Sequence, residues 1–266
     1  MNPEFELPNG KSEFRSLGSL EVFPGRPIVV NDITKNQLRP GVSMLDLDIA
    51  AKVLFASSFP CQPEYVTLQE LSEPMTAILR GMLKNVDDQT SAVIFLGNGA
   101  QPVYETCWEG KINFDPWNVY KIKAERIFEN NKPKSVFFEF PKVMRDAFEF
   151  PRYKKIFVID DVIATGLTLN GLIKKLNYPS QYTAISWFRR KPTTIEGYDF
   201  IASVLEYKSL DPNSYPALNS LSTWLRTDEK GLLVRETYKK KYIAPRGYPR
   251  GFDKQINYIR SLTTVA

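Results

Sequence analysis

The sequence of 266 residues contains no histidine and only two cysteines, Cys61 and Cys107. Without histidine, the chain has no access to Ser-His-Asp or Cys-His catalysis, to a histidine-ligated zinc ion or to an imidazole general base. Two cysteines cannot build a zinc site by themselves, and they allow at most one disulfide. Two free thiols in a reducing compartment are the simpler interpretation.

Long apolar runs are also missing. No segment approaches the roughly 20 apolar residues that are needed to span a bilayer. The N-terminal residues 1–5, Met-Asn-Pro-Glu-Phe, have neither the charged nor the apolar region of a signal peptide. We therefore expect a cytoplasmic protein with no membrane partner.

Positive charge is only slightly in excess: the chain has 35 Lys and Arg and 30 Asp and Glu, which gives a formal net charge of +5. This balance is compatible with an anionic ligand and falls short of the charge density of an obligate nucleic-acid-binding protein. The length predicts one large domain or slightly more, with a core that needs no disulfide or metal.

Apolar periodicity predicts the secondary structure. Residues 1–45, rich in Pro, Gly and Asn, are typical of a loop-rich arm with one short strand at 27–30. Residues 66–84 have the pattern of an amphipathic helix, in which Thr67 and Glu70 are placed to form a capping box. Strands are expected at 91–96, 119–122, 135–140, 155–159, 183–188 and 200–205, and helices at 102–108 and 167–176. Their alternation predicts an α/β fold with a mostly parallel sheet flanked by helices.

The segment with the clearest chemistry is residues 155–169, in which a predicted buried strand delivers Asp160 and Asp161 at its carboxyl end. A turn of small residues follows and opens a helix; it consists of Ala164, Thr165, Gly166, Leu167 and Thr168. Backbone N–H groups and threonine hydroxyls of such a turn can surround a phosphate. The carboxylates suit vicinal sugar hydroxyls or a divalent cation. An Asp-Asp turn before an ordinary capped helix is the structural alternative.

The run at residues 159–169, Ile-Asp-Asp-Val-Ile-Ala-Thr-Gly-Leu-Thr-Leu, resembles the phosphoribosyl-pyrophosphate (PRPP) motif of type I phosphoribosyltransferases, in the wording of the adenine enzymes. The resemblance implies that residues 164–168 hold the 5′-phosphate of PRPP. It implies that Asp160 and Asp161 hold the ribose hydroxyls directly or through Mg²⁺. Ala164 stands where 6-oxopurine enzymes often carry a carboxylate, which favours the adenine type.

A second segment fits the same family, in which an earlier strand ends in a small loop that contacts pyrophosphate. The corresponding residues here are Gly97, Asn98, Gly99, Ala100 and Gln101. They depart from the family pattern at Asn98, where Arg or Lys is common, and at Ala100, which replaces the second glycine. The family's basic strand and mobile flap fall at 120–123 and 125–134, and Lys123 is the candidate cation on the pyrophosphate side.

The resemblance covers residues 91–206 as a phosphoribosyltransferase-like core. It implies a PRPP-dependent transfer of the 5-phosphoribosyl group to a nitrogen acceptor, a nucleobase or a related compound, in nucleotide metabolism. Residues 1–90 and the basic, aromatic extension 207–266 are expected to form the hood that binds the acceptor. Trp187 or Phe188 is a candidate to stack on that acceptor, with a place in the core as the alternative. Dimers are common in the family, so a homodimer is a further expectation.

Two other functions stay open. A regulator that binds PRPP without turnover would account for the departures at Asn98 and Ala100. A role linked to nucleic acid would use residues 235–250, where Arg and Lys alternate with tyrosines that can stack on bases. A solvated surface segment is the simpler interpretation of that stretch.

Overall fold

The computed structural model describes residues 13–21, 28–58, 64–84, 86, 89–97, 99–101, 104, 108, 118–129, 132–141, 153–190, 193, 195–208, 218–225 and 252–264. The predicted helix at 102–108, apart from Tyr104 and Trp108, lies outside these residues, as do both cysteines and the basic stretch 235–250. The chain divides into two units. One combines residues 1–22 with 72–215, and the other combines residues 23–71 with 216–266.

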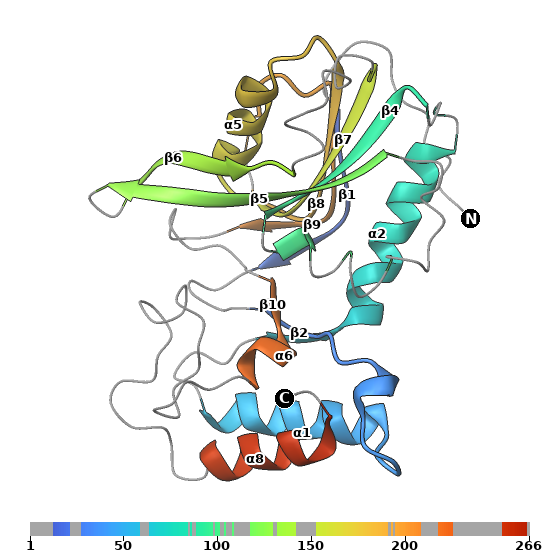
Figure 1. Cartoon of the computed structure of the whole chain (residues 1–266), viewed down its shortest axis with the longest axis vertical. Coiled ribbons are helices and arrows are strands. Elements are labelled where there is room, and N and C mark those ends of the chain that lie inside the picture. The colour runs from blue at the N-terminus through green and yellow to red at the C-terminus, as the bar shows by residue number, and fades with distance from the viewer. Residues whose placement is uncertain are drawn as a thin grey trace. The chain divides into compact units, whose positions relative to one another are not determined.

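The first unit is built on a seven-stranded sheet in the order β1-β9-β8-β7-β4-β5-β6 (Figure 1). Its strands are β1 (Glu13–Glu21), β4 (Ser91–Leu96), β5 (Asn118–Glu129), β6 (Lys132–Glu139), β7 (Lys155–Ile163), β8 (Gln181–Arg190) and β9 (Phe200–Lys208). All neighbouring strands run parallel except β5 and β6, which are antiparallel. The predicted mostly parallel α/β fold is confirmed.

The two faces of this sheet have different cores. Ile94 of β4 and Val158 of β7 belong to a buried cluster with Leu169 and Leu172 of helix α5 (Leu167–Leu176). Because side chains alternate along a strand, the neighbouring Phe95 points to the other face. There its ring lies 5.8 Å from that of Trp108, which stacks on the buried Trp187 at the same centroid distance.

Trp187 and Phe188 are therefore part of the core, which was the alternative to a stacking role. Trp108 also donates its indole N–H to Thr76 Oγ1 at 2.9 Å, which ties helix α2 (Leu68–Leu83) to this aromatic group.

The start of α2 follows the predicted capping box. The Thr67 backbone N–H donates to Glu70 Oε2 at 2.7 Å, and the Glu70 N–H donates to Thr67 Oγ1 at 3.3 Å. The predicted bounds of 66–84 need correction, because β3 (Glu64–Thr67) precedes the helix. Strand β3 pairs with β2 (Ile28–Asn31), in the register Ile28↔Glu64. The partner strand lies 36 residues upstream in the sequence, so the local pattern before the helix does not reveal it.

Two expectations about irregular segments were wrong. Residues 1–45 contain β1 and β2 as well as the start of an unexpected helix, α1 (Met44–Ser58). The predicted flap at 125–134 is mostly paired, since β5 runs to Glu129 and β6 begins at Lys132. Its polar side chains alternate with inward-facing ones along the hairpin, and Lys134 and Glu129 form an ion pair at 2.6 Å. The β5–β6 hairpin is visible as a long ribbon in Figure 1.

The second unit joins segments from both flanks of the sequence. A parallel sheet in the order β10-β2-β3 pairs Ile28–Asn31 with Glu64–Thr67 and with β10 (Leu218–Ser220). Helix α1 packs with α8 (Phe252–Leu262), and α6 (Leu221–Trp224) begins after β10. The core of this unit includes Leu47, Leu54, Phe55, Leu221, Ile256 and Ile259.

Candidate functional site

The sequence predicted Asp160 and Asp161 at the carboxyl end of their strand. In the structure they lie inside β7, which continues to Ile163. Pairing with β4 stops at Ile159, whereas pairing with β8 continues to Ile163. The two aspartates are thus the first β7 residues beyond the stretch that pairs with β4, beside the end of that strand and the turn that follows it. This is the carboxyl edge of a parallel sheet, where open α/β folds bind their ligands.

The two carboxylates face opposite sides of the strand, because successive residues alternate. Asp160 is on the α5 side and is 6% exposed, and its Oδ1 accepts the Asp161 backbone N–H at 2.9 Å. Burial, and then the charge of Asp161, raise the pKa of Asp160 well above its usual value, while the nearby Arg126 guanidinium acts in the opposite direction. Asp160 is therefore shielded from solvent, and the two carboxylates cannot bind the same group of a ligand together.

Asp161 faces the turn after β4 and is only partly buried. Gly99 lies against it so closely that a Cβ on Gly99 would overlap the carboxylate. Gly97 begins the turn in the left-handed region at φ 72°, a conformation that favours glycine. The structure thus brings the predicted pyrophosphate loop and Asp161 together.

Other residues of that loop have mixed positions. Ala100 is fully buried, and the Gln101 side-chain nitrogen is buried with no hydrogen-bond partner among the described residues. Asn98 lies outside the described residues.

The turn at 164–168 has the conformation expected of an anion site. Gly166 precedes α5 in the left-handed region, at φ 74° and ψ −1°, and no described side chain makes an N-cap hydrogen bond to the helix. The Thr165 side chain is exposed, and Thr168 is 7% exposed. Backbone N–H groups at an uncapped helix N-terminus are donors for a phosphate.

A second layer of contacts holds this turn in place. Thr193 Oγ1 donates to the carbonyl oxygen of the buried Ala164 at 2.8 Å. The Tyr198 hydroxyl donates to the Leu169 carbonyl at 3.1 Å. The Leu167 N–H reaches Thr165 Oγ1 only at 3.4 Å, near the limit for a hydrogen bond.

The expected cation, Lys123, is exposed and forms an ion pair with Glu139 of the neighbouring strand at 3.3 Å. It lies three residues from Arg126 along β5, and therefore on the opposite face of the hairpin. Sequence reasoning missed Arg126 because it fell in the predicted loop. The sequence pattern that could have found it is alternation along a strand. Every second residue of β5 shares the inward face: Tyr120, Ile122, Ala124 and Arg126.

Lys121 is a second missed cation. Its Nζ lies 5.8 Å from the ring centroid of Tyr104, a residue that follows the loop after β4. Lys121 shares the face of Lys123 and of Asp161, because Phe95↔Lys121 and Phe95↔Ile159 are register partners. It stands on the side of the sheet where the sequence pattern assigns pyrophosphate.

Among the described residues, no group of three His, Cys, Asp or Glu side chains surrounds a common point. Asp161 is the partly accessible carboxylate of the pair, and carboxylate oxygens are ligands that Mg²⁺ accepts. In the part of the chain that the structure describes, no helix has the length and apolar character to cross a membrane.

The sequence matches no protein-family model, and it has no significant match among curated proteins. Solved structures with some similarity include a purine phosphoribosyltransferase from Pyrococcus horikoshii, at 16% identity over 57% of this chain and 93% of that one, with a TM-score of 0.40. A xanthine-guanine-hypoxanthine phosphoribosyltransferase from Helicobacter pylori has 15% identity over 51% and 86%, with a TM-score of 0.37.

Proposed function

We propose that this chain is a PRPP-dependent phosphoribosyltransferase, which moves the 5-phosphoribosyl group to a nitrogen acceptor such as a nucleobase. The observation that carries the proposal is the contact between Asp161 and Gly99 at the carboxyl edge of β7 and β4, next to the uncapped turn at 164–168. These features provide a carboxylate for sugar hydroxyls between two turns that can bind phosphate groups.

Each part of PRPP then has its own group of residues. The 5′-phosphate is bound by backbone N–H groups at residues 164–168, with the hydroxyls of Thr165 and Thr168. The pyrophosphate faces residues 97–101. Asp161 accepts hydrogen bonds from the ribose hydroxyls.

The reaction is a displacement at C1 of the ribose. The acceptor nitrogen forms a bond to C1 with its lone pair, and the bond from C1 to the pyrophosphate oxygen breaks, so that pyrophosphate leaves with that electron pair. The proton that the acceptor nitrogen carried is released to solvent. Positive charge develops at C1 in the transition state. The carboxylate of Asp161, bound to the ribose hydroxyls, is negatively charged and stabilises that charge. Asp160 is buried on the opposite face of β7. From there it affects the position of the strand and the charge close to the site.

Magnesium is the metal that this donor set fits, and Asp161 would hold it, with Asp160 too deeply buried for direct contact. When bound, Mg²⁺ neutralises the charge of the leaving pyrophosphate. The acceptor-binding role of residues 1–90 and 207–266, the homodimer and the nucleic-acid role of 235–250 stay predictions.

A protein that binds PRPP without turnover is the second candidate. Two observations favour it: Asn98 occupies the position where the family commonly has a cation, and Lys123 pairs with Glu139. Weak binding of pyrophosphate would allow recognition of the sugar phosphate without efficient departure of the leaving group.

Release of pyrophosphate from PRPP and Mg²⁺ separates the candidates, measured alone and with a panel of nucleobases. Release that one base stimulates supports the transferase and identifies the acceptor. A PRPP-induced rise in melting temperature without release supports the second candidate. If PRPP causes neither release of pyrophosphate nor a rise in melting temperature, both candidates are overturned.

A further inference from the structure

The β5–β6 hairpin packs directly against helix α5, at a glycine. A Cβ on Gly171 would lie 3.3 Å from Phe138 Cε2 and 3.8 Å from Val136 Cβ. Both of these β6 side chains therefore point at the helix, and the missing side chain at Gly171 lets the hairpin approach. Phe138 is buried there, in the cluster that contains Leu169 and Leu172.

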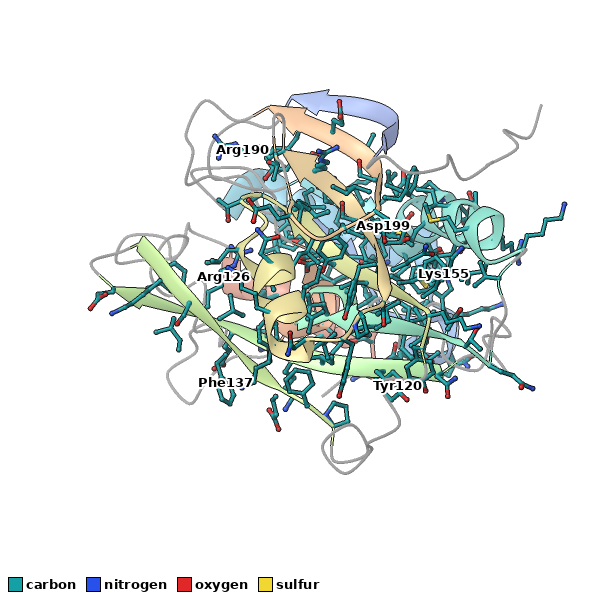
Figure 2. All side chains as sticks on the ribbon, turned by 90° about the horizontal axis from the view of Figure 1, so that it is seen from above. Tyr120, Arg126, Phe137, Lys155, Arg190 and Asp199 are labelled. Carbon is teal, nitrogen blue, oxygen red and sulfur yellow. The ribbon has the colours of Figure 1, made fainter. Side chains whose placement is uncertain are left out.

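The strand register carries this contact over to β5. Ala124 is the partner of Phe138, and Arg126 is the partner of Val136. Cross-strand partners share a face, so Arg126 points at α5 as well. Figure 2 labels Arg126 beside this helix.

Arg126 reaches the first turn of α5. Its Nε lies 3.4 Å from Thr168 Oγ1, and Thr168 is three residues before Gly171, on the same side of the helix. Its positive charge also acts on Asp160. The guanidinium thus contacts the turn at 164–168 and acts electrostatically on the buried carboxylate.

That turn has no positive charge of its own, because it consists of Ala, Thr, Gly, Leu and Thr. A phosphate monoester brings close to two negative charges at neutral pH. Lys123 faces the other side of β5 and pairs with Glu139. Among the described cations, Arg126 contacts a side chain of the turn directly, through Thr168.

We infer that Arg126 binds the phosphate of the sugar phosphate held at residues 164–168, and that the packing of the hairpin on Gly171 positions it there. This inference rests on the proposed function. The planar guanidinium has five N–H donors, so it bonds two phosphate oxygens with its terminal nitrogens and keeps Nε for Thr168.

The test compares binding of ribose 5-phosphate and of PRPP with Mg²⁺ by calorimetry, in the wild type and in Arg126→Gln, Arg126→Lys and Lys134→Gln. Lys134 is the matched control, since it is a cation of the same hairpin that is paired with Glu129. We expect Arg126→Gln to weaken ribose 5-phosphate binding about 10- to 100-fold, the usual range for a lost charged hydrogen bond. Arg126→Lys loses less, and Lys134→Gln changes nothing.

Gly171→Val is a second, independent variant that retains Arg126. The added side chain pushes Phe138 away, and the same loss of ribose 5-phosphate binding is expected if the hairpin positions the guanidinium. Thermal melts establish that each variant folds.

The outcomes separate this inference from the proposed function. Equal binding by wild type and Arg126→Gln overturns the inference and leaves the transferase untouched. Binding of ribose 5-phosphate that depends on Arg126, without pyrophosphate release in any assay, supports the inference and removes the transferase. A wild type that binds neither ligand overturns both.

Discussion

Gly99, in the turn after β4, lies in contact with the carboxylate of Asp161 in β7, with no room for a methyl group between them. This relationship couples two segments that are 62 residues apart and that have separate roles in the proposed function. The glycine is needed here for close approach, whereas Gly97 at the start of the same turn is needed for its left-handed backbone.

Gly99→Ala is therefore expected to displace Asp161 and to destabilise the protein by about 1–3 kcal/mol, the range for overpacking. Urea unfolding measures this loss. The double variant Gly99→Ala/Asp161→Gly is the control, because the added carbon would also lie 2.6 Å from Asp161 Cβ, so only removal of the whole side chain relieves the overlap. Destabilisation of the same size in the wild-type and Asp161→Gly backgrounds would show that the two residues do not act on each other.

Asp160 and Asp161 are expected to respond differently to replacement by asparagine. Asp161→Asn is expected to abolish or greatly weaken PRPP binding and to leave the fold intact, because the proposed function assigns the ribose hydroxyls to this carboxylate. Calorimetry with PRPP and Mg²⁺ measures this. An unchanged affinity would remove Asp161 from the sugar site.

Asp160→Asn acts on stability. Burial raises the pKa of Asp160 in the folded state, so the folded form holds this proton more tightly than the unfolded chain. The stabilising effect is complete below the ordinary aspartate pKa of about 3.9 and is lost as pH rises through the raised value. Melting temperatures from pH 4 upward should therefore shift in favour of Asp160→Asn. A difference that does not change with pH contradicts a raised pKa.

Gly166→Val is expected to block the phosphate turn. Gly166 has φ 74°, and a β-branched residue strains that backbone by about 1–2 kcal/mol and fills the space beside the N–H groups. Binding of ribose 5-phosphate should be lost. Gly41→Val is a matched control, because Gly41 has φ 84° with nothing within 4 Å of an added Cβ. It should show a similar loss of stability with normal binding, and equal binding losses in both would point to strain alone.

Thr67→Ala is expected to destabilise α2 by about 1 kcal/mol through loss of the capping hydrogen bond. The hydrogen bonds from Thr67 also lower the pKa of Glu70. Glu70 therefore contributes stability above the ordinary glutamate pKa of about 4.3, and this contribution is lost as pH falls through the lowered value. Thermal unfolding at pH 7 and pH 3 checks both points, because the effect of Thr67→Ala should be smaller at pH 3.

Local sequence determined the elements whose signals are short-range. Six consecutive apolar or small residues make β4 a buried strand, and all six are buried. The α5 bounds follow from Gly166 before the helix and from the apolar spacing that buries Leu169, Leu172 and Leu176. The capping box at Thr67 and the turn chemistry at 164–168 depend on residues within four positions of each other, so the pattern alone predicts them.

Tertiary structure decided what depends on pairing between distant segments. The partner of β1 is β9, more than 180 residues later, and the two flanks of the chain meet in one sheet through β10 and β2. The register of β5 with β6 placed Lys123 opposite Glu139 and turned Arg126 toward α5. A shift of one residue would exchange these two faces, and the packing of Val136 and Phe138 on Gly171 favours the register that brings the arginine to the turn at 164–168.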